Sequence, residues 1–441
     1  MSEGQNNLET PKAPLPEGTI PVGIGLLISG LAAYIFFKVG QLALGKEGFK
    51  PIVALWFTSF ALIPGFFMPV EQELGRALAH RRALHQGGRP VVRRMLMLTC
   101  GIAALLTVVT LGASQWLTND MFEGYGIVTV ALILGFCAYA PMHMARGIAS
   151  GSGRFTAYGI IMGVDGLMRT GTCILLWALG VTNVGAYALA VALSPLAAVL
   201  VVVARGDITT EDGPPANFSE VTPNLGWLIL GSIMGAALVN AGPLGVDILA
   251  HSDDAARVTA FGNGVLLSRI PLFLFQAVQA ALLPRLARLA AKGDLAEFKQ
   301  GLSLLLKIVV AVAVLGTVGS FLVGPPILDI MYEGGLDRRT LTLLALASGL
   351  YMLALAIAQA VIALQGHKYV AIGWLSAMVS FLVFTAFSSN DLFLRVELGL
   401  VAGSTAALIV FSYALRARMQ AGAIPDAESL IDGILDNPLE S

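Results

Sequence analysis

Long apolar runs alternate with short polar segments along the whole chain. A run of about 20 apolar residues is long enough to cross the hydrocarbon core of a bilayer as a helix. Most connections between the runs are short, mostly under a dozen residues. The pattern predicts twelve membrane-spanning helices over residues 20–44, 51–70, 95–117, 125–144, 156–179, 184–203, 225–248, 258–283, 302–327, 341–364, 370–387 and 392–415.

Composition supports an all-α polytopic membrane protein. The chain is 56% hydrophobic and 12% charged, whereas soluble proteins carry about 25% charged residues. A polar tail precedes the first run and no small-residue cleavage site follows it, so we predict a retained span and not a signal peptide. The absence of a strongly basic domain argues against a nucleic-acid partner.

The three cysteines, Cys100, Cys137 and Cys173, all lie inside apolar runs, and no pair has the spacing of metal ligands. We interpret them as small core residues and expect neither a metal nor a cofactor.

The distribution of basic residues predicts the orientation. The three longest connections, Glu71–Arg94, Arg205–Asn224 and the segment after Leu283, fall on one side of the predicted membrane. That side holds 17 of the 27 Lys and Arg residues and the other side holds 6. By the positive-inside rule both termini are cytoplasmic, in a multi-pass protein of the plasma membrane.

The two halves of the chain look related. Met121-Phe122-Glu123-Gly124 precedes the fourth span, and Met331-Tyr332-Glu333-Gly334 precedes the tenth, 210 residues later. Six spans per half give both halves the same orientation, so we predict two six-helix lobes related by a pseudo-two-fold axis along the membrane normal. The predicted divisions are a cytoplasmic tail 1–19, an N-lobe 20–205, a cytoplasmic linker 206–223, a C-lobe 224–416 and an acidic cytoplasmic tail 417–441.

Arg269 is the most informative charged residue inside a span. It lies near the middle of the eighth apolar run, and no acid stands three or four residues away. A charged guanidinium at that depth costs at least ~2.5 kcal/mol, so water, an acid or an anionic substrate must face it. We interpret Arg269 as a substrate-binding residue, with Gln276 on the same helix face.

Asp165 and Arg169 are four residues apart on the fifth span and share one helix face. They either neutralise each other or form a charged wall of a substrate cavity. Lys38, on the outer half of the first span, either reaches the outer surface or contacts substrate.

Asp247, near the outer end of the seventh span, is a candidate ion-coupling residue, and Asp165 is a second. The histidines at span ends are expected to be solvated: His143, His251 and His367.

No nucleophile elbow, phosphate loop or metal-binding cluster is present in the sequence. Membrane glycosyltransferases and polymerases are expected to carry large outer loops with catalytic acids, whereas the first outer loop here holds only Glu47. We therefore predict a transporter and not an enzyme.

Four segments carry a family resemblance: FFMPVEQELGRALAHRR, ARGIASGSGRFTAYG, SRIPLFLFQAVQAALLPRLARLAAKGD and YMLALAIAQAVIALQGHKY. The chain resembles the polysaccharide-flippase branch of the multidrug/oligosaccharidyl-lipid/polysaccharide exporter superfamily, and more distantly the lipid II flippases. The resemblance implies two lobes around a V-shaped cavity that move an undecaprenyl-linked glycan outward for polysaccharide biosynthesis. It also implies that Arg269, Arg169 and Lys38 represent the cationic cavity residues.

Two departures from the lipid II flippases disfavour lipid II itself as the substrate. The two extra C-terminal spans are missing, and the second span has no basic residue before Arg76.

Two alternatives remain open. A cation-coupled multidrug exporter would need an acidic pocket in the first lobe, where Asp165 stands alone. A transport-dead scaffold would bind polysaccharide-assembly proteins through the acidic tail and the segment Glu71–Arg94. Otherwise the expected partners are the lipid-linked glycan and membrane lipid.

Overall fold

The computed structural model describes residues 19–218, 225–251, 254–272, 275, 289, 295–364 and 366–421. Within them, 11 helices are long and apolar enough to cross a membrane, and each overlaps one predicted span. The long helices are α1 (Thr19–Gly48), α2 (Lys50–Ala83), α3 (Arg89–Gly112), α5 (Gly126–Gly151), α6 (Phe155–Ala178), α7 (Val184–Ala204), α8 (Leu225–Leu249), α9 (Ala255–Ser268), α11 (Leu295–Tyr332), α12 (Arg338–Ala363), α13 (His367–Phe387) and α14 (Leu392–Ala421).

The remaining predicted span, 258–283, is represented by α9 alone, because most of residues 273–294 lie outside the described part. The prediction of one continuous helix with Arg269 near its centre does not hold at Arg269, where α9 ends. The Arg269 amide bonds back three residues to the Leu266 carbonyl. Pro271 follows and has no amide hydrogen to continue the helical ladder, which accounts for the interruption.

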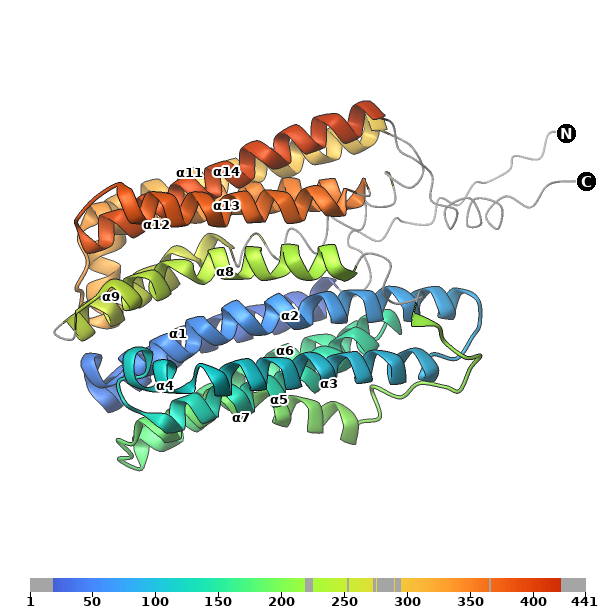
Figure 1. Ribbon diagram of the computed structural model, residues 1–441, viewed down its shortest axis with the longest axis horizontal. Coiled ribbons are helices and arrows are strands. Elements are labelled where there is room, and N and C mark those ends of the chain that lie inside the picture. Colours follow the sequence, from blue (N-terminus) through green and yellow to red (C-terminus); the bar gives the residue numbers. More distant parts are fainter. Residues whose placement is uncertain are drawn as a thin grey trace, which may run out of the picture.

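The helices form two groups that lie side by side (Figure 1). Helices α1–α3 and α5–α7 make the N-lobe, and α8, α9 and α11–α14 make the C-lobe. α1 begins and α14 ends at the same end of the molecule, which we call the terminal end. The opposite end, where α1 ends and α9 begins, is the predicted outer end.

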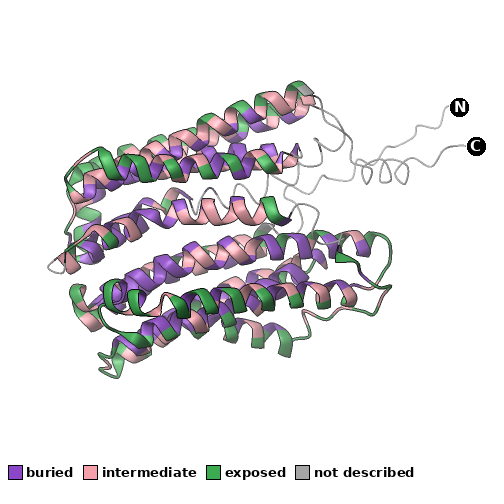
Figure 2. Cartoon of the chain, in the orientation of Figure 1, coloured by how far each residue is buried: buried purple, intermediate pink, exposed green. Residues whose placement is uncertain are grey.

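Burial separates core helices from helices that face lipid (Figure 2). Over the most apolar 18-residue stretch of each helix, 72% of α2 is buried inside the protein, against 17% of α11. An apolar helix without protein cover needs lipid around it, so α11 forms part of the membrane-facing wall. Of the three cysteines predicted to be core residues, only Cys173 is buried, whereas Cys100 and Cys137 are exposed on such outer faces.

Glycines bring α1 and α6 into backbone contact. A Cβ placed on Gly159 would lie 2.2 Å from the Pro21 carbonyl oxygen, and one on Gly25 would lie 2.3 Å from the Gly159 carbonyl oxygen. Only glycine permits this approach, which is the usual use of small residues between membrane helices.

The repeated loops have the same backbone conformation in both lobes. Glu123 and Gly124 have φ of 53° and 82°, and Glu333 and Gly334 have φ of 61° and 71°. A left-handed glutamate is uncommon, so its recurrence at matching positions is strong support for the internal repeat.

Arginines of the N-lobe hold the described part of the predicted linker. Arg81 donates to the Pro214 carbonyl at 2.8 Å, and Arg89 forms a 2.8 Å ion pair with Asp212. Arg154 donates to the Asp207 carbonyl at 2.9 Å. Several of the basic residues that set the predicted orientation therefore also bind the linker between the lobes.

Candidate functional site

Arg269 lies where the two lobes meet. The interruption after α9 directs its guanidinium toward α8, where it donates to the Val239 carbonyl and, at 3.2 Å, to the Asn240 amide oxygen. Its Cζ also lies 5.2 Å from the centre of the Phe57 ring on α2. A cation over an aromatic face is stabilised by the quadrupole of the ring, more so where water is excluded.

Arg269 forms no ion pair with any residue of the described chain. Its position at the C-terminus of α9 is favourable to a positive charge because helix carbonyls converge there. A cavity of about 40 Å³ adjoins it, with the hydroxyl residues Ser268, Ser348, Tyr351 and Ser404 in the lining. One water needs roughly 10–15 Å³, so the cavity can hydrate the arginine but cannot hold a saccharide.

Asp165 and Arg169 form the predicted pair, with 3.5 Å between Asp165 Oδ2 and Arg169 Nη1. Ser194 donates to Asp165 at 2.7 Å, and Arg169 donates to the Tyr139 hydroxyl at 3.2 Å. Arg169 is only 1% exposed. In this conformation the two charges neutralise each other inside the N-lobe, although the Arg169 Nε has no hydrogen-bond partner among the described residues.

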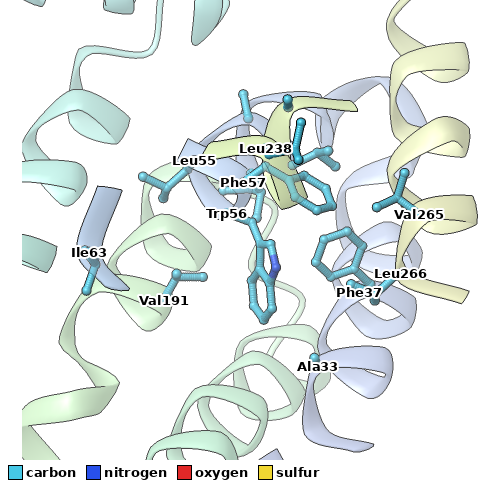
Figure 3. Packing of buried hydrophobic residues seen from close by; sticks show 14 of the residues in the cluster. Ala33, Phe37, Leu55, Trp56, Phe57, Ile63, Val191, Leu238, Val265 and Leu266 are labelled. Atoms are coloured by element: carbon cyan, nitrogen blue, oxygen red, sulfur yellow. The ribbon is translucent and has the colours of Figure 1, made fainter. Parts of the chain in front are cut away.

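Helix α2 separates Arg169, which is buried, from Arg269, which is half-buried. Arg169 lies over Trp56 at 4.7 Å, whereas Arg269 lies over the next residue, Phe57. Figure 3 shows Trp56 and Phe57 in the apolar cluster that also contains Leu238 of α8. A shift of α2 would therefore alter the surroundings of both cations.

Within the described part of the chain, the other predicted site residues make no contact with Arg269. Lys38 is half-buried on α1 and makes no hydrogen bond or ion pair with a described residue. Gln276 lies outside the described residues. Asp247 is at the outer end of α8, with a 6% exposed surface.

Asp247 has a partner that the sequence did not reveal. Lys50, the first residue of α2, is 4% exposed and lies between Asp247 of the C-lobe and Glu123 of the N-lobe. Its Nζ is 3.5 Å from Asp247 Oδ1. The predicted spans place Lys50 in the first outer loop, whereas the structure buries it between the two lobes.

Further hydrogen bonds join the lobes at the same end. Gln41 and Asn263 exchange two bonds through their side-chain amides, at 2.7 and 2.9 Å. Thr259 donates to the Lys46 carbonyl at 2.7 Å. Together with the Lys50–Asp247 pair, these contacts form the outer closure.

A second buried network, centred on Glu71, was not predicted from the sequence. Glu71 of α2 accepts from Tyr158 at 2.8 Å and lies 2.7 Å from His143 Nδ1 and 3.1 Å from Arg146. His143 is 2% exposed, so the expectation that it is solvated is wrong. The network joins α2, α5 and α6 through residues up to 87 positions apart, and only their common location at predicted span ends could have indicated it.

Comparisons with known proteins agree with this architecture. The family model described as the lipid II flippase MurJ matches residues 172–417, more than half of the chain. No curated protein sequence matches this chain significantly.

Among solved structures, a MATE transporter in complex with MaL6 is 18% identical, with a TM-score of 0.70, and the match covers 92% of this chain and 96% of that one. An inward-facing multidrug MATE transporter of the MOP superfamily is 17% identical, with a TM-score of 0.68, over 93% of this chain and 96% of that one. A Vibrio cholerae MATE transporter mutant is 16% identical, with a TM-score of 0.68, over 92% and 96%.

At such identities the structural likeness shows the fold alone. It confirms the predicted architecture of two six-helix lobes, and the family match confirms the flippase branch predicted from the four segments. The matched family, the lipid II flippases, is the one that the four segments resemble more distantly.

Proposed function

Because the chain belongs to the MurJ family of lipid II flippases, we propose that it carries a lipid-linked saccharide of the undecaprenyl-pyrophosphate type across the plasma membrane. Movement is from the cytoplasmic to the outer leaflet, with both termini cytoplasmic. The family match and the fold show that the protein is a multi-pass membrane transporter and not an enzyme.

The uncompensated charge of Arg269 is the main support for this proposal. It is a cation at the lobe interface whose described partners are a carbonyl, an amide oxygen and an aromatic ring. None of these neutralises its charge. A pyrophosphate would, because a guanidinium can donate two parallel hydrogen bonds to phosphate oxygens.

The outer closure supports alternating access. With the lobes joined at the outer end, substrate would enter from the terminal end, and release outward would require the Lys50–Asp247 and Gln41–Asn263 contacts to separate. Rocking of one lobe against the other is the usual motion of transporters built from repeats.

Arg169, Asp165 and Lys38 remain proposed contacts. Arg169 can reach a substrate phosphate only if its pair with Asp165 opens, since both are buried within the N-lobe. Lys38 has no ionic partner in the described chain and is therefore free to meet an anion.

The experiment compares Arg269→Lys, Arg269→Ala and the matched control Arg257→Ala. Arg257 lies on α9, the helix that leads to Arg269, but it pairs with Asp254 at the surface. Lysine keeps the charge and loses the two-pronged geometry, so Arg269→Lys should retain partial transport, whereas Arg269→Ala should lose nearly all. The readout is lipid-linked saccharide at the outer face of cells, normalised to protein level.

Full export by Arg269→Ala would remove the substrate-binding role. To identify the saccharide, the wild-type protein would be expressed in cells depleted of their lipid II flippase, with the same variants beside it. Rescue of growth would indicate lipid II, and its failure, with export of another glycan intact, would indicate a different head group.

A further inference from the structure

A groove lies between α11 and α14 near the terminal end. Both helices pack along α12, and the space left between them has a volume of about 540 Å³. Its apolar walls are Leu302, Leu306 and Val310 of α11 with Leu415 and Met419 of α14. The groove belongs to the part of the C-lobe farthest from the N-lobe helices, so it is separate from Arg269 (Figure 1).

One wall of the groove is cationic. Lys299, Ser303 and Lys307 succeed one another at intervals of four residues, so they share one face of α11. All three are exposed, and neither lysine makes an ion pair or hydrogen bond with any described residue. Lys307 lies inside the predicted span 302–327, where an ammonium without a counter-charge is costly unless it reaches water or an anion.

We propose that this groove binds an anionic phospholipid of the leaflet at the terminal end. The phosphodiester would lie against Lys299, Ser303 and Lys307, and an acyl chain would follow Val310 and Leu415. Basic pockets between membrane helices on the cytoplasmic side are typical sites for anionic head groups. The proposal does not depend on the transported substrate.

The order of polar and apolar positions favours a lipid over the acidic tail of the chain. From Lys299 to Ala311 the groove extends about 18 Å along the helix, at 1.5 Å per residue, and it becomes apolar with depth. A phospholipid has this same order from head group to chain. Residues 422–441, with Asp426, Glu428 and Asp432 and no basic residue, would have to bring carboxylates to apolar depth.

The test uses the full-length protein, purified and exchanged into defined lipid, with native mass spectrometry counting bound phosphatidylglycerol and phosphatidylcholine. The wild type should retain phosphatidylglycerol under conditions that remove phosphatidylcholine. Lys299→Gln/Lys307→Gln should bind it about 30-fold more weakly, since each lysine near a membrane surface changes affinity for anionic lipid roughly fivefold. Lys368→Gln, an exposed lysine of α13 outside the groove, should bind like the wild type.

Equal binding by the double variant and the wild type would overturn the proposal, as would equal retention of the two phospholipids. A chain ending at residue 421 should bind like the full chain. If lipid binds only after this truncation, the tail is the occupant. Displacement of phosphatidylglycerol by a polyprenyl phosphate at much lower concentration would assign the groove to the lipid carrier instead.

Discussion

Removing Lys50 should open the outer end of the protein. The Lys50–Asp247 pair joins the lobes only while that end is closed, and the two side chains are 5% and 1% exposed. Taking one partner from a buried ion pair costs about 3–5 kcal/mol, because the other charge remains desolvated. For Lys50→Met, about 3 kcal/mol would shift the closed-to-open equilibrium roughly 100-fold toward the open form.

The consequence for transport follows from the same equilibrium. A protein held open at its outer end returns slowly to the state that loads substrate, so export should fall although the protein reaches the membrane. The double variant Lys50→Met/Asp247→Leu should recover much of the closure, because apolar replacement of both partners removes the stranded charge.

The assay is the distance between spin labels at Asn119 and Asn390, two exposed residues at the outer end of the N-lobe and the C-lobe. The three native cysteines would first be replaced by serine. Lys50→Met should add a longer distance, and the double variant should reduce it. Lys46→Met is the control, because Lys46 also crosses to the C-lobe but, among the described residues, donates only to the exposed Glu333 carbonyl. An unchanged distance distribution in Lys50→Met would refute the reasoning.

Three further predictions rest on single features. Neutral single substitutions of Asp165 or Arg169 should reduce stability or export more than the double substitution, measured as folded protein and exported glycan, and equal activity of all three with the wild type would exclude the pair from function. Gly159→Leu should lower the thermal unfolding temperature, since even its Cβ would lie 2.2 Å from a backbone oxygen of α1. Cysteine labelling of intact cells should modify a cysteine at Asn119 and not one at Arg82, and the reverse result would invert the orientation.

The sequence was sufficient for the positions of eleven of the twelve predicted spans and for the division into two related halves. A bilayer requires backbone groups to be satisfied within each segment, so a spanning helix must be apolar over a definite length that can be read directly. The repeat could also be recognised from the sequence. Its two matching motifs place Glu123 and Glu333 in a left-handed loop conformation that few glutamates adopt. Asp165 and Arg169 could be paired because one helix carries both.

Only the tertiary structure decided which charges meet across helices. Lys50 pairs with Asp247 and Glu71 with His143, over separations that no helical periodicity links. Arg269 likewise donates hydrogen bonds to oxygens of α8 because α9 ends just before it. A membrane helix that is apolar all round gives little indication of the face it turns to its neighbours, so such partners depend on how the lobes pack. The sequence by itself thus determined where the chain crosses the membrane, and the packing of α1 and α2 against α8 and α9 determined which end is closed.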